Sequence, residues 1–290
     1  MQAQRARFDD GRWHFQHGPI DLVIGADGDA RACDAAHADA WRRFQAVLPE
    51  LVAELPALRL PVRGPCPLQG AIARRMWLAC RPHHSVFITP MAAVAGAVAQ
   101  ELIACYEREG VRRAWVNNGG DIALHLAPDE SLRVGLFADL ARLDPAQVRV
   151  DGYFDVRADI PVRGVATSGW RGRSFSLGIA DSVTVLARTA ARADAAATII
   201  ANAVDVVDAR IRRAPANQLK DDSDLGELPV TVDVPALPAE LVQRALQAGR
   251  QRALALQREG LIHSAALVCQ SAWLRVEAEV HETELGSVFA

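Results

Sequence analysis

The sequence is poor in lysine, in clustered basic residues and in long apolar segments. Lys220 is the sole lysine, and 32 basic residues against 35 acidic ones leave a net charge of −3. The arginines are scattered, without a basic cluster interleaved with aromatic residues, so nothing indicates a nucleic-acid partner. No run approaches 18 consecutive apolar residues, and we therefore expect no membrane span.

Cysteine is scarce and shows no pairing pattern. The five cysteines are an odd number and include no CxxC pair, which argues against a disulfide framework and against a cysteine zinc site. The opening stretch MQAQRARFDDGRWHF lacks the apolar core of a signal peptide. We therefore expect a cytoplasmic protein in a reducing compartment.

The composition is that of an ordinary globular protein. Half of the residues are hydrophobic and 23% are charged. A chain of 290 residues can bury one large core or two modest ones. Because we find no repeat, no low-complexity tract and no linker, we predict a single domain over residues 1–290.

Hydrophobic periodicity predicts helices and strands in mixed order. Alternation indicates strands at 12–33 (two around a turn), 71–80, 112–116, 121–127, 131–139, 180–188 and 263–278. Helical spacing indicates helices at 34–55, 89–110, 191–213 and 238–260, with a polar loop at 214–229 and an irregular segment at 140–163. There is no regular βαβ alternation, so we predict an α+β fold, with mixed or antiparallel sheets packed against helices.

The stretch VNNGGDIAL places Asn117, Asn118, Gly119, Gly120 and Asp121 between two apolar runs. One interpretation is a hairpin turn, for which such residues are typical. The other is a position where the backbone comes close to a ligand, since loops on a rigid sheet often carry sites. The two interpretations are compatible.

The segment 193–204 is almost entirely small or apolar, apart from Asp194, Thr198 and Asn202. Residues four apart share one helix face, so these three form a polar stripe. An unpaired buried carboxylate costs several kcal/mol, which means that something must face the stripe. Mg²⁺ suits Asp194 with a Thr198 hydroxyl. The alternative, equally open, is an Asp at the helix N-terminus and a Thr bonded back to the preceding turn.

Three further stretches contain residue types that occur in binding sites. The small residues of 91–99 predict a close approach, either by a ligand or by a neighbouring helix. Hydroxyls, glycine and arginine in 164–178 suit a phosphate-bearing ligand, although this stretch by itself favours a polar surface turn. His83 and His84 are adjacent, a poor metal pair in a strand, and are interpreted as structural or surface residues.

Together these stretches resemble the ApbE family, the FAD:protein FMN transferases. Three blocks occur in the family's order: TPMAAVAGAVAQ, then VNNGGDIAL, then ATSG through ADSVTVLAR to ADAAATIIANAV. The phrases SFSLGIADSVTV, ADAAATIIAN and GLIHSAALVCQ are typical of the UPF0280 group, a branch of that superfamily. The resemblance covers most of the chain.

The resemblance implies an ApbE-like fold around a cleft that binds FAD or FMN with Mg²⁺. In the full enzymes FMN passes from FAD to a Thr or Ser of an acceptor protein and AMP leaves. The implied metal ligands are the Ala92 carbonyl, Asp194 and Thr198. The implied flavin-binding residues are Met91, Gly96, Asn118, Gly119, Gly120, Asp121, Thr167, Ser168, Gly169 and Arg173.

The chain departs from the family pattern at two places. Ala95 stands where classical members have a Lys, and Arg173 stands where they have a His, without the Asp-Pro that follows it. Arg stays charged and cannot act as a general base at neutral pH, so no catalytic residue is assigned. The alternative is a protein that binds a flavin or another phosphorylated cofactor without transferring it, with a pocket repurposed for one-carbon or methanogenic-type cofactor metabolism. An acceptor protein and a homo-oligomer stay open as partners.

Overall fold

The computed structural model describes residues 2–136 and 152–278. The strands are β1 (Gln4–Arg7), β2 (Trp13–His17), β3 (Ile20–Gly28), β4 (Val111–Asn118), β5 (Asp121–Leu126), β6 (Ser131–Leu136), β7 (Gly152–Arg157), β8 (Gly164–Ser168), β9 (Ser182–Ala187), β10 (Arg212–Pro215), β11 (Pro229–Asp233), β12 (Ser264–Cys269) and β13 (Ala272–Val276). The helices are α1 (Ala30–Ala53), α2 (Leu55–Leu58), α3 (Ala71–Cys80), α4 (Val94–Ile103), α5 (Ala190–Ala203), α6 (Ala216–Leu219) and α7 (Ala239–Arg258). Short 3-10 helices are η1 (Arg81–His83), η2 (Pro90–Ala93) and η3 (Ala104–Tyr106).

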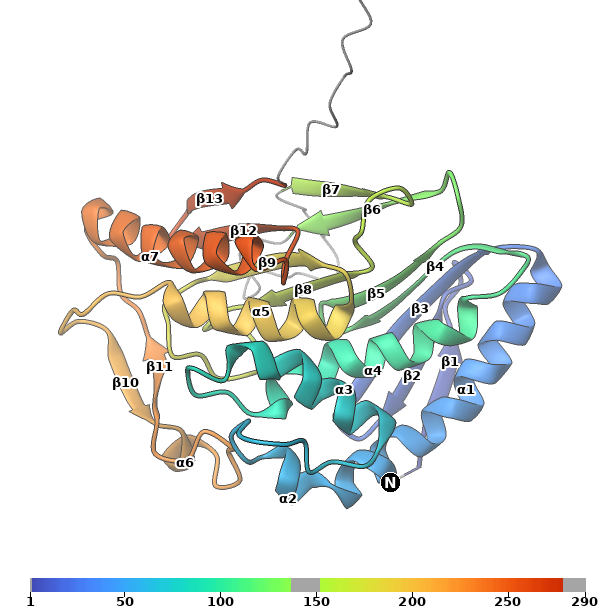
Figure 1. Ribbon diagram of the computed structural model, residues 1–290, viewed down its shortest axis with the longest axis horizontal. Helices are drawn as coiled ribbons and strands as arrows, with labels where there is room; N and C mark the ends of the chain where they lie inside the picture. The colour runs from blue at the N-terminus through green and yellow to red at the C-terminus, as the bar shows by residue number, and fades with distance from the viewer. Residues whose placement is uncertain (1, 137–151, 279–290) are drawn as a thin grey trace, which may run out of the picture.

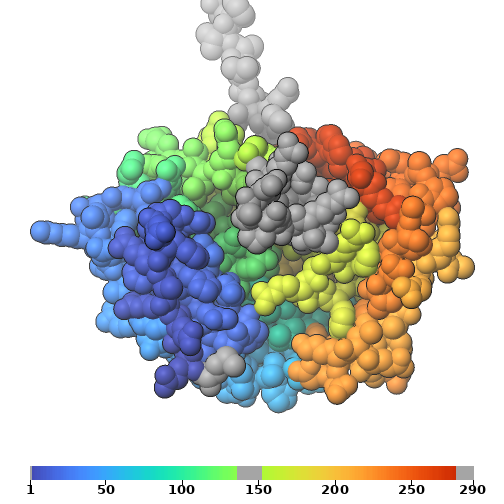
Figure 2. Space-filling model, turned by 180° about the vertical axis from the view of Figure 1, so that it is seen from behind, coloured from blue at the N-terminus to red at the C-terminus, as the bar shows by residue number. Residues whose placement is uncertain are grey.

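A nine-stranded sheet organises the molecule, in the order β1-β2-β3-β4-β5-β8-β9-β12-β13. Each neighbouring pair is antiparallel. Helices α3, α4, α5 and α7 lie in front of this sheet in Figure 1. Seen from behind, the N-terminal strands occupy one side of the molecule and the C-terminal segments the other (Figure 2). The α+β prediction with antiparallel sheets is therefore confirmed.

Both faces of the central strands are covered. Ala123, Ala166 and Val185 belong to the large core beneath the helices. Their strand neighbours face the other way, and Leu124 and Leu186 join a second cluster with residues of the separate β6–β7 hairpin. Side chains alternate between faces along a strand, so adjacent residues of one strand enter two different cores. The site described below lies on the helix side.

Several predicted elements are confirmed. The two strands around a turn in 12–33 are β2 and β3, and the strands at 112–116 and 121–127 are β4 and β5. The strand at 180–188 is β9. The helix at 34–55 is α1, which begins earlier, where the Asp29 side chain accepts from the Ala32 N–H. The helix at 238–260 is α7, followed by Gly260 at φ +69.

The strand predicted at 71–80 is wrong, because this segment is helix α3. Its buried side chains include Ile72, Met76 and Cys80, which recur every four residues and therefore share one helix face. The short apolar run fits strand and helix alike by eye, and packing against the core decides it. His83 and His84 accordingly follow a helix, with His83 buried and His84 exposed.

The helix predicted at 191–213 is too long, because α5 ends at Ala203. The Ile179 N–H donates to the Val204 carbonyl oxygen over 2.8 Å. A side chain at Gly178 would begin 2.2 Å from the Ala201 carbonyl oxygen, so a neighbouring loop lies directly on the helix end. The residues that directly follow Ala203 do not signal the end of a helix.

Other boundaries also differ. The helix at 89–110 is divided into η2, α4 and η3, with Ala93 off helical geometry at φ −130 and ψ 15. The irregular segment 140–163 contains strand β7, and the loop 214–229 contains α6. The closing strand is a hairpin of β12 and β13. The strand predicted at 131–139 is β6 up to Leu136, and residues 137–151 lie outside the described part.

No helix within residues 2–136 and 152–278 has the length and apolar character needed to cross a membrane.

Acid is expected to weaken the fold through His83. This side chain is 2% exposed, and burial lowers its pKa from 6.5 to about 4. Between those pH values His83 binds a proton more readily in the unfolded chain, so its contribution to stability rises with pH in this window and is lost as pH falls through it. The full effect is about 3 kcal/mol. Urea unfolding of the protein and of His83→Phe at pH 7, 6, 5 and 4 measures it, and the variant should lose less stability on acidification than the unsubstituted protein. An unchanged slope in His83→Phe would contradict this assignment.

Candidate functional site

The VNNGGDIAL stretch forms a two-residue hairpin turn between β4 and β5, with Asn118 paired to Asp121. Gly119 and Gly120 have φ values of +65 and +110, in the region that glycine favours. The Gly120 N–H donates to the Asn117 Oδ1 over 2.8 Å, which fixes the turn. The hairpin interpretation is therefore confirmed.

The hairpin is bonded to the start of α4. The Asn118 side chain donates from Nδ2 to the Ala95 carbonyl oxygen over 3.1 Å. The next residue of α4, Gly96, donates its N–H to Asp194 Oδ2 on α5 over 2.9 Å. Two short contacts therefore join the sheet, α4 and α5 at one point.

Gly96 is needed where α4 crosses α5. A Cβ at this position would lie 2.3 Å from the Ala190 carbonyl oxygen and 2.9 Å from the Asp194 Cβ. The small residues of 91–99 thus allow a close helix–helix approach at Gly96, one of the two explanations left open by the sequence. Gly96 contributes to the site through its backbone N–H, which donates a hydrogen bond to the Asp194 carboxylate.

Asp121 lies at the start of β5 and is buried. Its Oδ1 accepts from the Thr167 N–H over 3.2 Å, which ties the end of β8 to the hairpin. The Thr167 hydroxyl lies 2.9 Å from the hydroxyl of Thr184 on β9. Sequence reasoning did not single out Thr184, and the available signal was a hydroxyl within the apolar strand SVTVLA.

Two carboxylates therefore face a shared, poorly hydrated region. Burial raises the pKa of Asp194 to about 7, while the N–H groups of Gly96 and Ala95 act in the opposite direction. The pKa of Asp121 is raised well above its usual range by burial and by the charge of Asp194. Two neighbouring carboxylates disfavour each other's ionised form unless a cation balances them. The charge arrangement thus favours binding of a cation.

The predicted metal ligands lie on adjoining elements. Thr198 is one helical turn after Asp194 on α5, and its hydroxyl has no hydrogen-bond partner among the described residues. Ala92 lies in η2, which packs against α5. Carboxylate, hydroxyl and carbonyl oxygens are the donors that Mg²⁺ prefers. Within residues 2–136 and 152–278 no three His, Cys, Asp or Glu side chains gather as a metal set, so any cation would depend on these mixed oxygens.

The polar stripe of α5 serves two purposes. Its third member, Asn202, accepts the Leu177 N–H over 2.9 Å and the Ser176 hydroxyl over 3.2 Å at Oδ1. This side chain holds the loop before β9 and is eight residues beyond Asp194. The stripe predicted by spacing is therefore real as a helix face, but Asn202 is occupied by protein groups.

The loop after β8 supplies the remaining predicted residues. Gly169 is buried, and a Cβ there would lie 2.2 Å from the Asp181 carbonyl oxygen, which indicates backbone packing. Ser168 is partly buried at the end of β8, and Met91 is partly buried in η2. Arg173 is exposed, and its guanidinium lies 3.6 Å from where a Gly119 side chain would begin.

Arg173 thus brings a positive charge to the hairpin turn. No carboxylate partner for it is found among the described residues, whereas Arg171 stacks on the Trp170 ring at 4.8 Å and lies 3.8 Å from Asp181. Of the two arginines in this loop, Arg173 is therefore the one positioned to meet an anionic group beside Gly119.

Comparison with known proteins gives one family match over nearly the whole chain. A family model described as AbpE bacteria matches residues 5–283. A UPF0280 protein of Methanopyrus kandleri is 36% identical over 220 residues, covering 73% of this chain and 83% of that protein. A UPF0280 protein of Methanospirillum hungatei is 38% identical over 122 residues, covering 42% of this chain and 47% of that protein. In that second match the chain spans about half of the relative's length.

Among solved structures, the flavinyl transferase ApbE of Pseudomonas stutzeri in its apo form overlaps with a TM-score of 0.43 at 11% identity. The overlap covers 96% of this chain and 94% of that chain.

Proposed function

Because this chain belongs to the UPF0280 proteins, an ApbE-like family, we propose that it binds a flavin nucleotide, FAD or FMN, together with Mg²⁺. The site would lie between the β4–β5 hairpin, η2 and α5. One observation carries the proposal: Asp194 and Asp121 are neighbouring carboxylates in a buried region, with no arginine or lysine paired to either among the described residues. A divalent cation is the partner that such a pair lacks.

Asp194, Thr198 and the Ala92 carbonyl would hold the cation. The Gly96 N–H fixes the Asp194 carboxylate through one of its oxygens, so the side chain is held in place at the start of α4 before any cation binds. When bound, Mg²⁺ would neutralise the phosphates of the nucleotide. The Asn118 bond to the Ala95 carbonyl would keep the hairpin against the same helix end, so that ligand and cation meet on a fixed frame.

The phosphate-facing part of the site would include Arg173. Its guanidinium is exposed and unpaired among the described residues, and the adjoining Gly119 has no side chain to block a ligand. A guanidinium recognises phosphate oxygens through two parallel hydrogen bonds. Arg173 would therefore bind and orient the nucleotide, and it would not take up a proton.

Transfer of FMN onto a protein hydroxyl is the second candidate function. In that reaction the hydroxyl oxygen of a Thr or Ser bonds to the FMN phosphorus, the pyrophosphate linkage breaks, and AMP leaves. The hydroxyl proton needs a base. Asp121 is the candidate for this base once a bound cation offsets its raised pKa, because it lies at the hairpin beside Asp194 and a carboxyl group accepts a proton only when it is ionised. Arg173 in place of the family's His supports binding without transfer.

A flavin titration tests the first proposal. Protein stripped of ligand is titrated with FAD and with FMN, each with and without Mg²⁺, by flavin fluorescence and calorimetry. Tight binding that requires Mg²⁺ supports the proposal. Absence of binding by either flavin would refute it and would direct the search to other phosphorylated cofactors.

Incubation with FAD and a Thr-containing acceptor peptide separates the two candidates. Release of one AMP for each FMN attached would establish transfer. Flavin that binds with Mg²⁺ and returns unchanged would leave binding as the function.

Replacement of Arg173 by Gln should weaken FAD binding about tenfold, because one charge-assisted phosphate contact is lost. The dependence of binding on Mg²⁺ should remain, since the carboxylates are intact. Calorimetry with FAD measures both. Arg171→Gln is the matched control in the same loop, and equal losses in the two variants would contradict a specific role for Arg173.

A further inference from the structure

The segment 55–100 has an unusual balance of charged residues. Residues 55–100 contain no Asp or Glu, although the protein as a whole is acidic. The stretch carries five arginines, and two of them are paired with carboxylates from outside it: Arg59 with Asp222, and Arg75 with Glu101. The remaining arginines, Arg63, Arg74 and Arg81, have no carboxylate partner among the described residues. Positive charge is therefore left over on one part of the surface.

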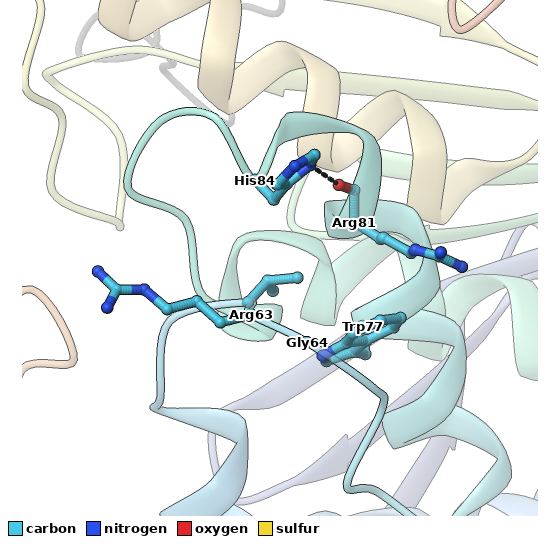
Figure 3. A pocket seen from close by; sticks show the side chains of 6 residues that line it. Arg63, Gly64, Trp77, Arg81 and His84 are labelled. Atoms are coloured by element: carbon cyan, nitrogen blue, oxygen red, sulfur yellow. Dashed lines mark hydrogen bonds between the residues drawn. The ribbon is translucent and has the colours of Figure 1, made fainter.

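Two of these arginines line the same cavity. It has a volume of about 190 Å³ and is lined by Val62, Arg63, Gly64, Trp77, Arg81 and His84. Figure 3 shows His84 and Trp77 on opposite sides of this cavity, with Arg63 and Arg81 extending outward to either flank. None of these residues belongs to the site described above.

The cavity has a buried floor and exposed cationic flanks. Trp77 is 4% exposed, and the Arg81 guanidinium lies 5.7 Å from the centre of its ring. His84 is held by its Nδ1, 3.0 Å from the Arg81 carbonyl oxygen, which leaves its Nε2 available. Gly64 has φ +63, and nothing lies within 4 Å of where its side chain would begin, so the entrance is open there.

The shape and the charge together define the ligand. A volume of about 190 Å³ is below the 300–1,000 Å³ typical of pockets for larger organic ligands, so it suits a phosphate or pyrophosphate group and excludes a whole flavin dinucleotide. The two guanidinium groups are donors for phosphate oxygens, and the Nε2 of His84 is an acceptor for the hydroxyl of a protonated phosphate, because the proton on Nδ1 faces the Arg81 carbonyl oxygen. The arginine side chains are exposed, so they can rotate over a bound anion without disturbing the core.

We propose that the cavity lined by Arg63, Trp77, Arg81 and His84 is a binding site for a phosphoryl anion, independent of the cation-dependent flavin site. The anion is either free phosphate or pyrophosphate, or the phosphate end of a nucleotide whose remainder lies outside the cavity.

Calorimetry in phosphate-free buffer at low ionic strength, with EDTA present to disable the cation site, tests this proposal. Inorganic phosphate, pyrophosphate and AMP are the probes. We expect saturable binding at one site per chain, weakened about tenfold or more in the double variant R63Q/R81Q. R74Q is the matched control, because Arg74 is an exposed arginine on α3, the helix that carries Trp77, and lies outside the cavity.

The outcomes are distinguishable. Loss of binding in R63Q/R81Q, with R74Q and R173Q unaffected, supports the proposal, and the order of affinities among the probes shows whether the anion is free or nucleotide-borne. An equal loss in R74Q would mean diffuse attraction to the surface and would overturn it. Loss in R173Q alone would place the anion at the flavin site and would also overturn it. No saturable binding of any probe at 10 mM would do the same.

Discussion

Asp194→Asn should abolish the Mg²⁺ dependence of flavin binding, with a loss of affinity of about 100-fold or more in the presence of Mg²⁺. Asn keeps the shape of the side chain and one oxygen that can accept from the Gly96 N–H, so the contact between α4 and α5 survives. What disappears is the negative charge that would hold the cation. Titration of FAD with increasing Mg²⁺ measures the effect.

The same substitution should raise the stability of the ligand-free protein by about 2 kcal/mol at pH 8, because it removes the charge of a partly buried carboxylate that neighbours the buried Asp121. Urea unfolding in EDTA measures this gain. A loss of Mg²⁺-dependent flavin binding together with a gain in stability indicates a cation site. Removal of a structural carboxylate would lower the stability instead. Asp34→Asn, on the exposed face of α1, is the matched control and should change neither quantity. Unaltered Mg²⁺ dependence in Asp194→Asn would remove Asp194 from the proposed site.

Gly96→Ala should destabilise the protein by about 3 kcal/mol or more. Within a helix this exchange ordinarily stabilises by about 1 kcal/mol. Here the new Cβ would lie 2.3 Å from the Ala190 carbonyl oxygen, and backbone atoms cannot move aside as a flexible side chain can. The helices α4 and α5 would have to separate, which would also break the bond from the Gly96 N–H to Asp194. Urea unfolding and flavin titration measure both losses.

Gly226→Ala is the control for this substitution. Gly226 has φ +55 and nothing within 4 Å of where its side chain would begin, so Ala meets no neighbour there and only the backbone conformation opposes it. We expect a cost of about 1 kcal/mol and intact flavin binding. If Gly96→Ala were as mild as Gly226→Ala, the close crossing of α4 and α5 would not be a constraint on the fold.

Local sequence predicts much of the hairpin between β4 and β5 and of the polar face of α5. The pair Gly119 and Gly120 predicts a two-residue turn because few other residues adopt positive φ at low cost. The spacing of Asp194 and Thr198 predicts a shared face because an α-helix repeats every 3.6 residues. Both follow from the chemistry of the residues themselves, and the structure has both.

Long-range contacts determine the features that local sequence does not predict. The end of α5 is set by the loop at Gly178 and Ile179, which precedes it in the chain, and no residue after Ala203 signals it. The role of Asn202 likewise depends on Leu177, so its spacing alone does not separate it from Asp194. A strand over 71–80 would separate Trp77 from Arg81 by four extended residues, whereas this segment is a helix and the Arg81 guanidinium lies 5.7 Å from the centre of the Trp77 ring.

The contacts at the candidate site have a consequence for how the protein is made. The bond between Gly96 and Asp194 spans 98 positions, and that between Asp121 and Thr167 spans 46. On a ribosome, therefore, no growing chain can assemble the site until α5 has emerged, well after the first five strands. If the proposed ligand binds there, it stabilises only chains that have completed this assembly, and by mass action it protects finished molecules from degradation while leaving incomplete ones exposed.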